Sequence, residues 1–256
     1  MDLGYFETSL PVADIGKSLA FYEALGFARA EHAEDAGAAT MIRGDCRIGL
    51  FQGHLDPARP QLTFWQGDVD SLGAEVKRMG VAFLRPLKKD DHGCAFMLQD
   101  PDGHPLYVIR MTTFYPQFPR HTQAAPTERP APLMMDRSLG WYEVSLPVAE
   151  MSRSVAFYKA LGFKEVLREP GDTRVTVQNA DCRIGLFQGH LDPAQVQLIF
   201  WQGDVLELAD DVRRAGLKFF REPSGQNDHA SFMLRDPDDH PLFFIRMPGV
   251  VRMDAA

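Results

Sequence analysis

The stretch Asp-Cys-Arg-Ile-Gly-Leu-Phe-Gln-Gly-His-Leu-Asp-Pro-Ala occurs twice in this chain, at residues 45–58 and again at residues 181–194. A shift of 136 positions, from 45 to 181, brings the copies into register and also aligns residues 4–27 with residues 140–163. An identity of this length does not arise by chance, so the chain is a tandem duplication. Its fold is therefore one structural unit built twice.

Further segments match under the same shift. Residues 61–69 align with residues 197–205, and Asp-Pro-Asp-Gly-His-Pro-Leu at 100–106 aligns with Asp-Pro-Asp-Asp-His-Pro-Leu at 236–242. The Asp-Pro-Asp-Gly sequence is a strong turn signal, because proline fixes φ at the second position and glycine tolerates a positive φ. We therefore expect a turn between two antiparallel strands near the end of each copy.

The periodicity inside one copy alternates between strand and helix. Phe6, Thr8 and Leu10 fall on one face of a strand, with Glu7 and Ser9 on the other. A helix is expected after Asp14, ending at Gly26, and three short strands are expected near residues 28–34, 40–43 and 46–52. The same order returns with a strand over 61–66, a helix over 68–79, and strands over 81–85, 94–99 and 105–110. Each copy thus holds two βαβββ modules, and the chain holds four.

The segment between the copies has a different composition. Residues 112–138 contain five prolines and no sustained apolar period. Proline fixes φ and removes a backbone donor, so this segment should be an extended connector. We expect a first domain over residues 1–111, a proline-rich linker over residues 112–138 and a second domain over residues 139–250.

Bulk composition narrows the class of protein. A chain of 256 residues can bury two cores, and its formal net charge of −8 comes without long runs of like charge, which makes nucleic acid an unexpected partner. Three cysteines without Cys-x-x-Cys spacing indicate free thiols in a reducing compartment. The N-terminus has no secretory pattern and no apolar stretch reaches about 18 residues, so we expect a cytoplasmic protein without a membrane span.

At this point the sequence resembles a known family. The motifs are Leu-Pro-Val-Ala-Asp at 10–14, Ser-Leu-Ala-Phe-Tyr at 18–22, Leu-Gly-Phe at 25–27 and Asp-Pro-Asp-Gly at 100–103. Together they resemble the vicinal oxygen chelate superfamily of glyoxalases, bleomycin-resistance proteins, fosfomycin-resistance enzymes and extradiol dioxygenases. The segment at 48–53 is similar to a glyoxalase-like branch, and the resemblance covers nearly all of both halves. It implies an α+β fold in which the four βαβββ modules form two incompletely closed eight-stranded barrels, each with a concave ligand face.

The resemblance also implies a test for a metal site. Family enzymes hold a divalent metal with His or Gln on the first strand, His on the fifth and Glu on the eighth, sometimes with Glu on the fourth. The matching positions in the first copy are Glu7, Gln61, Tyr107 and Gly49, and those in the second copy are Glu143, Gln197, Phe243 and Gly185. A transition-metal site needs about three nitrogen, sulfur or carboxylate ligands. Both sets fall short, so we expect no cofactor, with a divalent metal as the alternative.

Strand parity then predicts an aromatic pocket with a few polar groups, the usual composition of a small-molecule site. Glu7 and Glu143 are the candidate catalytic residues. The candidate substrate-binding residues are Gln61, Trp65, Tyr107, Arg47 and Phe51 in the first half, and Gln197, Trp201, Phe243, Arg183 and Phe187 in the second. The tryptophans could equally be core packing, and the arginines could end in solvent.

The two candidate carboxylates interrupt apolar strands. A carboxylate in an apolar cavity has to be protonated, paired or useful. Arg47 could pair with Glu7, and Arg183 with Glu143, which would make structural ion pairs without chemistry. The six repeat-related histidines are interpreted as polar residues near the surface, with a relocated two-histidine site as the alternative; they are His54, His190, His92, His229, His104 and His240.

Several functions remain open from the sequence. The leading hypothesis is a protein with degenerate metal sites that binds a small organic molecule in one or two cavities, either as a binding protein or as a cryptic enzyme. The alternative is a metal-dependent lyase or isomerase of the glyoxalase type. A third hypothesis is a scaffold with collapsed cavities, and an extradiol dioxygenase is the least expected. The chain should act as a monomeric pseudo-dimer or as a homodimer, with each cavity closed within one half or completed by the other.

Overall fold

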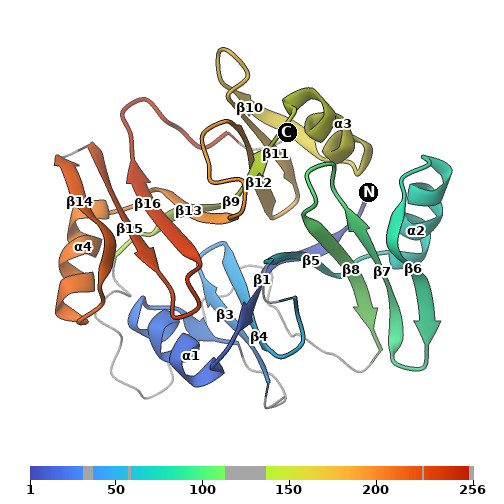
Figure 1. Cartoon of the computed structure of the whole chain (residues 1–256), viewed down its shortest axis with the longest axis horizontal. Helices are drawn as coiled ribbons and strands as arrows, with labels where there is room; N and C mark the ends of the chain where they lie inside the picture. Colours follow the sequence, from blue (N-terminus) through green and yellow to red (C-terminus); the bar gives the residue numbers. More distant parts are fainter. Residues whose placement is uncertain (31–36, 57–58, 113–136, 227, 254–256) are drawn as a thin grey trace.

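The computed structural model describes the chain except for residues 31–36, 57–58, 113–136, 227 and 254–256. The described residues form two eight-stranded sheets and four helices (Figure 1). The elements of the first half are β1 (Gly4–Val12), α1 (Ile15–Ala24), β2 (Ala28–Arg29), β3 (Ala38–Arg43), β4 (Cys46–Gln52), β5 (Gln61–Gln66), α2 (Val69–Arg78), β6 (Phe83–Asp90), β7 (Gly93–Gln99) and β8 (Pro105–Met111). Those of the second half are β9 (Gly140–Val148), α3 (Met151–Ala160), β10 (Lys164–Arg168), β11 (Arg174–Asn179), β12 (Cys182–Gln188), β13 (Gln197–Gln202), α4 (Val205–Arg214), β14 (Phe219–Gln226), β15 (His229–Arg235) and β16 (Pro241–Arg246).

Helix α1 begins and ends where the sequence predicts. The Asp14 side chain accepts a hydrogen bond from the backbone N–H of Lys17 at 3.2 Å, which caps the first turn. Gly26 follows the helix with a φ of 79°, a conformation that suits glycine because it has no Cβ. The predicted helix limit therefore has a local cause.

Each sheet is built within one half of the chain. Its strand order in the first half is β2-β3-β4-β1-β5-β8-β7-β6, and the second half repeats that order from β10 to β14. The two modules of a half meet where β1 pairs antiparallel with β5, and each module contains one parallel pair, β1 with β4 and β5 with β8. The described parts of β2 and β6 are not paired with each other, so the sheet curves without closing. The predicted α+β fold of four modules in two open barrels is confirmed.

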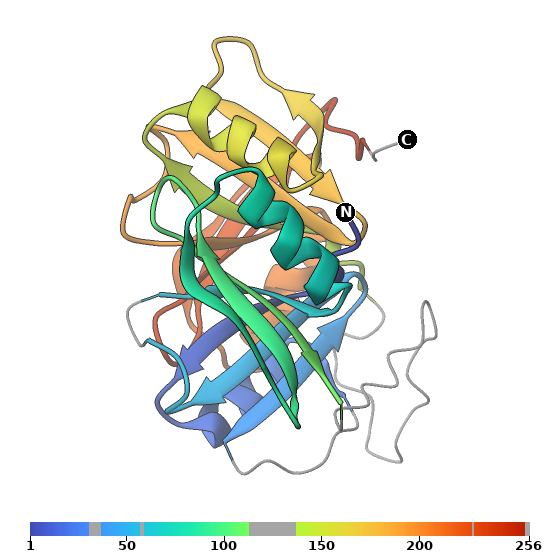
Figure 2. The ribbon, with the colours of Figure 1, turned by 90° about the vertical axis from the view of Figure 1, so that its right-hand side faces the viewer.

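One face of each sheet packs against helices and against the other half. Phe64 contacts Phe163 edge-on, with the ring centroids 6.3 Å apart, and the Thr8 hydroxyl lies 2.7 Å from that of Tyr142. Figure 1 shows α1 below the start of β16, and α3 in the corresponding place above the start of β8. Figure 2 shows α2 lying along the first sheet with α3 of the second half above it. The helix-covered faces of both sheets thus share one continuous core.

The strand expected over 81–85 differs from the structure in its limits. It is β6, which runs from Phe83 to Asp90 in a hairpin with β7. Its outer part carries Lys88 and Lys89, whose charges obscured the strand pattern; β6 is an edge strand, where charged side chains can stay in solvent. Part of the strand expected over 28–34 and most of the predicted linker lie outside the described residues. None of the described helices is long and apolar enough to cross a membrane.

Candidate functional site

The side chains predicted to line a cavity lie on the face of the sheet that points away from the helices. Glu7 on β1 is paired with Thr63 on β5, which is paired in turn with Tyr107 on β8. On the other side, Ser9 is paired with Gly49 on β4. Because side chains at paired positions share a face, these four strands bring the predicted residues onto one concave surface.

Glu7 is held at the centre of this surface by neutral groups. Its carboxylate accepts hydrogen bonds from the Thr40 hydroxyl at 2.8 Å, the Ser9 hydroxyl at 3.0 Å and the Trp65 indole N–H at 3.3 Å. The residue is 2% exposed. Burial raises the pKa of the Glu7 carboxyl above its ordinary value, although the three hydrogen bonds and the charge of Arg47 oppose that rise.

Gly49 makes room for this carboxyl. A Cβ at position 49 would overlap Glu7 Oε1 and would lie 2.6 Å from Cε2 of Phe51. Gly185 has the same relation to Glu143 and Phe187 in the second half. The fourth-strand position of the family's ligand set is therefore occupied by the neighbouring glutamate, and a larger residue there would displace it.

Glu143 has the same hydroxyl and indole partners, but it also has a cation. Thr176, Ser145 and Trp201 donate to its carboxylate at 3.0, 3.5 and 3.3 Å. In addition, Nη2 of Arg174 lies 3.1 Å from Oε1 and 3.2 Å from Oε2. Glu143 is thus a buried, ion-paired carboxylate, with Arg174 itself only 4% exposed.

Arg174 fills the concave surface of the second half. Its guanidinium carbon lies 4.1 Å from the centre of the Trp201 ring system and 5.3 Å from that of Phe187, distances typical of cation–π contacts. The residue at the same place in the first half is Ala38, which pairs with Phe51 as Arg174 pairs with Phe187. The sequence reasoning missed this position, and the signal that could have found it was the Ala-to-Arg difference between two otherwise similar strands.

Of the two arginine pairs considered from the sequence, the structure contains the one between Arg183 and Glu143 but not the one between Arg47 and Glu7. Arg47 forms its ion pair with Asp181 of the second half and lies 5.8 Å from the ring centre of Tyr5, so it acts on Glu7 through charge rather than through contact. Arg183 does approach Glu143, with Nε 3.8 Å from Oε2, but it donates to Gln178 at 3.0 Å and to the Met253 carbonyl at 2.7 Å. The main cationic partner of Glu143 is Arg174, because its Nη2 lies 3.1 and 3.2 Å from the two carboxylate oxygens, closer than the 3.8 Å of Arg183.

The remaining predicted positions lie on the same faces. Phe51 and Trp65 are partly exposed, and Tyr107 is partly buried, which raises the pKa of its phenol above the ordinary value. Gln61 donates to the Thr63 hydroxyl at 3.1 Å. In the second half, Trp201 is 5% exposed, whereas Gln197, Phe243 and Phe187 are partly exposed.

This donor set does not fit a divalent transition metal. In the first half it offers one carboxylate, the neutral amide of Gln61, whose oxygen is a weak ligand, and Tyr107, whose phenol pKa is raised by burial. In the second half the guanidinium of Arg174 lies against the carboxylate oxygens, where a metal would have to bind. Among the residues that the structure describes, no cluster of three or more His, Cys, Asp or Glu side chains could hold an ion.

Two histidines are buried, although the sequence predicted that they lie near the surface. His104 and His240 are each 9% exposed, and their Nδ1 atoms lie 2.8 and 2.9 Å from Asp100 and Asp236. The same aspartates accept hydrogen bonds across the two halves, Asp100 from the Tyr158 hydroxyl at 2.9 Å and Asp236 from the Tyr22 hydroxyl at 3.0 Å. The Asp-Pro-Asp motif therefore joins the two halves, and its histidines support that contact.

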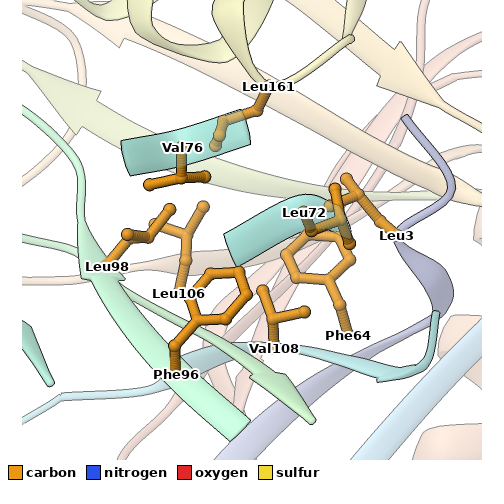
Figure 3. A pocket seen from close by; sticks show the side chains of 9 residues that line it. All are labelled: Leu3, Phe64, Leu72, Val76, Phe96, Leu98, Leu106, Val108 and Leu161. Carbon is orange, nitrogen blue, oxygen red and sulfur yellow. The ribbon is translucent and has the colours of Figure 1, made fainter. Parts of the chain in front are cut away.

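Two pockets lie away from the concave surfaces. One is an apolar void of about 10 Å³ between α2 and the first sheet, closed by Leu161 of the second half (Figure 3). That volume is at the limit for a single water, and the lining offers no polar partner. The other is an open groove of about 410 Å³ between the Asp-Pro-Asp turn and α3, with Arg153 and Phe157 on its wall.

Comparisons with known proteins agree with this architecture. The 2,3-dioxygenase LapB from Pseudomonas sp. KL28 superposes with a TM-score of 0.61 at 14% identity, covering 98% of this chain and 95% of that one. The Mn(II)-bound glyoxalase from Novosphingobium aromaticivorans gives 0.61 at 18% identity, covering 98% and 83%. A catechol 2,3-dioxygenase gives 0.56 at 16%, covering 98% and 90%. At such identities the likeness concerns the fold alone.

Among curated proteins, none matches the sequence. The sequence profile of the Glyoxalase/Bleomycin resistance protein/Dioxygenase superfamily matches residues 4–108 and residues 138–244, which together make up most of the chain. Both matched segments contain two βαβββ modules and one concave surface. The chain belongs to the Glyoxalase/Bleomycin resistance protein/Dioxygenase superfamily, in a form that carries the family's fold unit twice.

Proposed function

We propose that this protein binds a small organic molecule on the concave surface of its first half, with Glu7 as the polar anchor. The observation that carries the proposal is the unequal partnership of two equivalent glutamates. Glu143 is neutralised within the chain by Arg174, whereas Glu7 has Ala38 in the corresponding place and three neutral donors. The second surface is filled by its own side chain, and the first keeps the polar and aromatic groups without that filling.

The composition of the first surface supports a binding role. Trp65, Phe51 and Tyr107 supply partly exposed aromatic area around one carboxyl group. Ligand sites combine such area with a small number of placed polar groups. A buried carboxyl whose pKa is raised by burial is also typical of functional sites, since its placement costs stability.

The test is a fragment screen of the full chain by ¹⁵N NMR, with the indole N–H of Trp65 and of Trp201 as two internal probes. Trp65→Phe and Trp201→Phe variants assign the two signals. Ligands should shift the Trp65 signal and leave the Trp201 signal in place, because Arg174 covers Trp201. A screen in which no fragment shifts Trp65, or in which both tryptophans respond alike, would overturn the proposal.

A metal-dependent lyase or isomerase of the glyoxalase type is the second candidate, favoured by the likeness to a Mn(II)-bound glyoxalase. The weak donor set around Glu7 speaks against it. Elemental analysis of the purified protein discriminates between the two, since stoichiometric zinc, nickel, iron or manganese would favour the lyase.

A further inference from the structure

We infer that the ligand of the first concave surface carries a flat cationic group of the guanidinium or amidinium class, which takes the place that the Arg174 side chain occupies in the second half. This inference rests on the proposed function and specifies the chemical class of its ligand. The second half supplies the template, since it is a copy of the same surface with a cation already in position.

The template defines three contacts for a flat cation. One guanidinium nitrogen of Arg174 lies 3.1 and 3.2 Å from the two oxygens of Glu143. The guanidinium carbon lies 4.1 Å from the Trp201 ring centre and 5.3 Å from the Phe187 ring centre. A carboxylate with aromatic rings around it is the arrangement that recognises guanidinium and related cations.

The first half retains every fixed part of this arrangement. Glu7, Trp65, Phe51 and Thr40 stand where Glu143, Trp201, Phe187 and Thr176 stand in the second half. The backbone is also equivalent, because Ala38 has the same strand partner as its counterpart. These contacts differ at position 38, where the first half has alanine and the second half has Arg174. The first half therefore lacks the side chain that carries the positive charge.

The charge balance around Glu7 supports a cationic occupant. Within the described residues, no cation lies within 4 Å of the Glu7 carboxylate, and its hydrogen-bond donors are hydroxyl and indole groups. The nearest strand arginine, Arg47, makes its ion pair with Asp181 and stands over Tyr5. A buried ionised carboxylate without a counter-charge is costly, so a ligand that brings the charge gains an interaction that a neutral ligand cannot make.

If the first surface lacks the covering arginine, Trp65 should be more exposed than Trp201, and it is. Trp201, under Arg174, is 5% exposed, whereas Trp65 is partly exposed. Thr40 is likewise 7% exposed where Thr176 is fully buried. The surface next to Glu7 is thus more open than its copy, on the side from which the arginine enters in the second half.

The test compares phenylguanidinium with phenylurea, a neutral molecule of nearly the same shape, by titration calorimetry and by the NMR signal of Trp65 in the full chain. We expect one phenylguanidinium per chain, bound at least tenfold more tightly than phenylurea. Glu7→Gln, which keeps the shape of the side chain, should reduce the affinity for phenylguanidinium to that for phenylurea. Ala38→Arg should abolish binding by supplying the cation internally.

Two controls keep the outcomes distinct. Ala38→Met adds side-chain volume at the same position without adding a charge. Circular dichroism with thermal unfolding verifies that each variant folds. If Ala38→Arg does not fold, Glu7→Gln still tests the inference. Equal affinity for the two probes, or unchanged phenylguanidinium binding in Glu7→Gln, overturns the cationic class. If other fragments shift Trp65 while phenylguanidinium does not, the ligand class is wrong and the proposed function stands. If nothing shifts Trp65, both fall.

Discussion

The same substitution at two equivalent positions should have very different effects on stability. Glu7→Gln and Glu143→Gln each remove one buried carboxyl charge from matched surroundings of hydroxyl and indole donors. The structures around them differ in their cations, since Glu143 contacts Arg174 at 3.1 Å and lies 3.8 Å from Arg183, whereas no cation lies within 4 Å of Glu7 among the described residues. The pair of variants therefore measures the effect of pairing the carboxylate with buried cations, of which Arg174 is the nearer.

The magnitude for Glu143→Gln follows from what remains around Arg174. Removing one partner of a buried ion pair costs about 3–5 kcal/mol, because an uncompensated charge is left inside. Arg174 keeps a second contact, with Nη1 3.3 Å from Glu169, whose side chain is 44% exposed. We therefore expect the lower end, about 3 kcal/mol, which for a protein of this size lowers the Tm by roughly 6–12 °C.

Glu7→Gln should change the free energy of unfolding by less than about 1 kcal/mol at neutral pH, since neutral hydrogen bonds replace neutral-to-charged ones. Its effect should depend on pH. The folded-state pKa of Glu7 is raised, so the carboxyl contributes stability below its ordinary value of 4.5, and that contribution is lost as the pH rises through the folded-state pKa. The variant should therefore gain stability relative to wild type as the pH rises above 4.5.

The assay is denaturant unfolding of the wild type and both variants, followed by far-ultraviolet circular dichroism between pH 4.5 and 8. The reasoning requires Glu143→Gln to be clearly the less stable variant at pH 7. Equal losses in the two variants, or a larger loss in Glu7→Gln, would show that Arg174 does not distinguish the two surfaces.

Three further outcomes are expected. Tyr22→Phe removes the hydroxyl that donates to Asp236 across the halves and should destabilise the chain by about 1–3 kcal/mol, as should the matched Tyr158→Phe; unchanged unfolding midpoints would refute the role of this contact. The Cys46 thiol, 1% exposed and with its pKa raised by burial, should react with a disulfide reagent only after unfolding, and fast labelling of the native protein would contradict this. Gly49→Ala should crowd Glu7 and Phe51 and lower the free energy of unfolding by about 1–3 kcal/mol. The control, Gly16→Ala at the start of α1, should not lower the Tm, and equal melting curves for the two variants would refute the crowding.

Much of the fold could be predicted from the chain because its causes are local. The identical segments at 45–58 and 181–194 reveal the repeat. The alternation of apolar and polar residues around Glu7 places its side chain on the sheet face opposite Phe6. The cap at Asp14 and the positive φ of Gly26 depend on neighbours within a few residues. Such features need no knowledge of the distant chain. The length of the edge strand β6 was underestimated, because its charged residues face solvent and do not show the apolar alternation of a strand that packs on the core.

The ion-pair partners of the buried carboxylates could be identified only in the tertiary structure. From the sequence, Arg47 could pair with Glu7 and Arg183 with Glu143. In the structure Arg47 pairs with Asp181 instead, and Glu143 has Arg174 as its nearest cation, with Arg183 at 3.8 Å. The repeat, the module order and the face on which each glutamate lies follow from local patterns in the chain, since strand periodicity acts over neighbouring residues. Which cation reaches which carboxylate was decided by the packing of strands and of the two halves. Ion pairing depends on distances across the sheet, which no local pattern encodes.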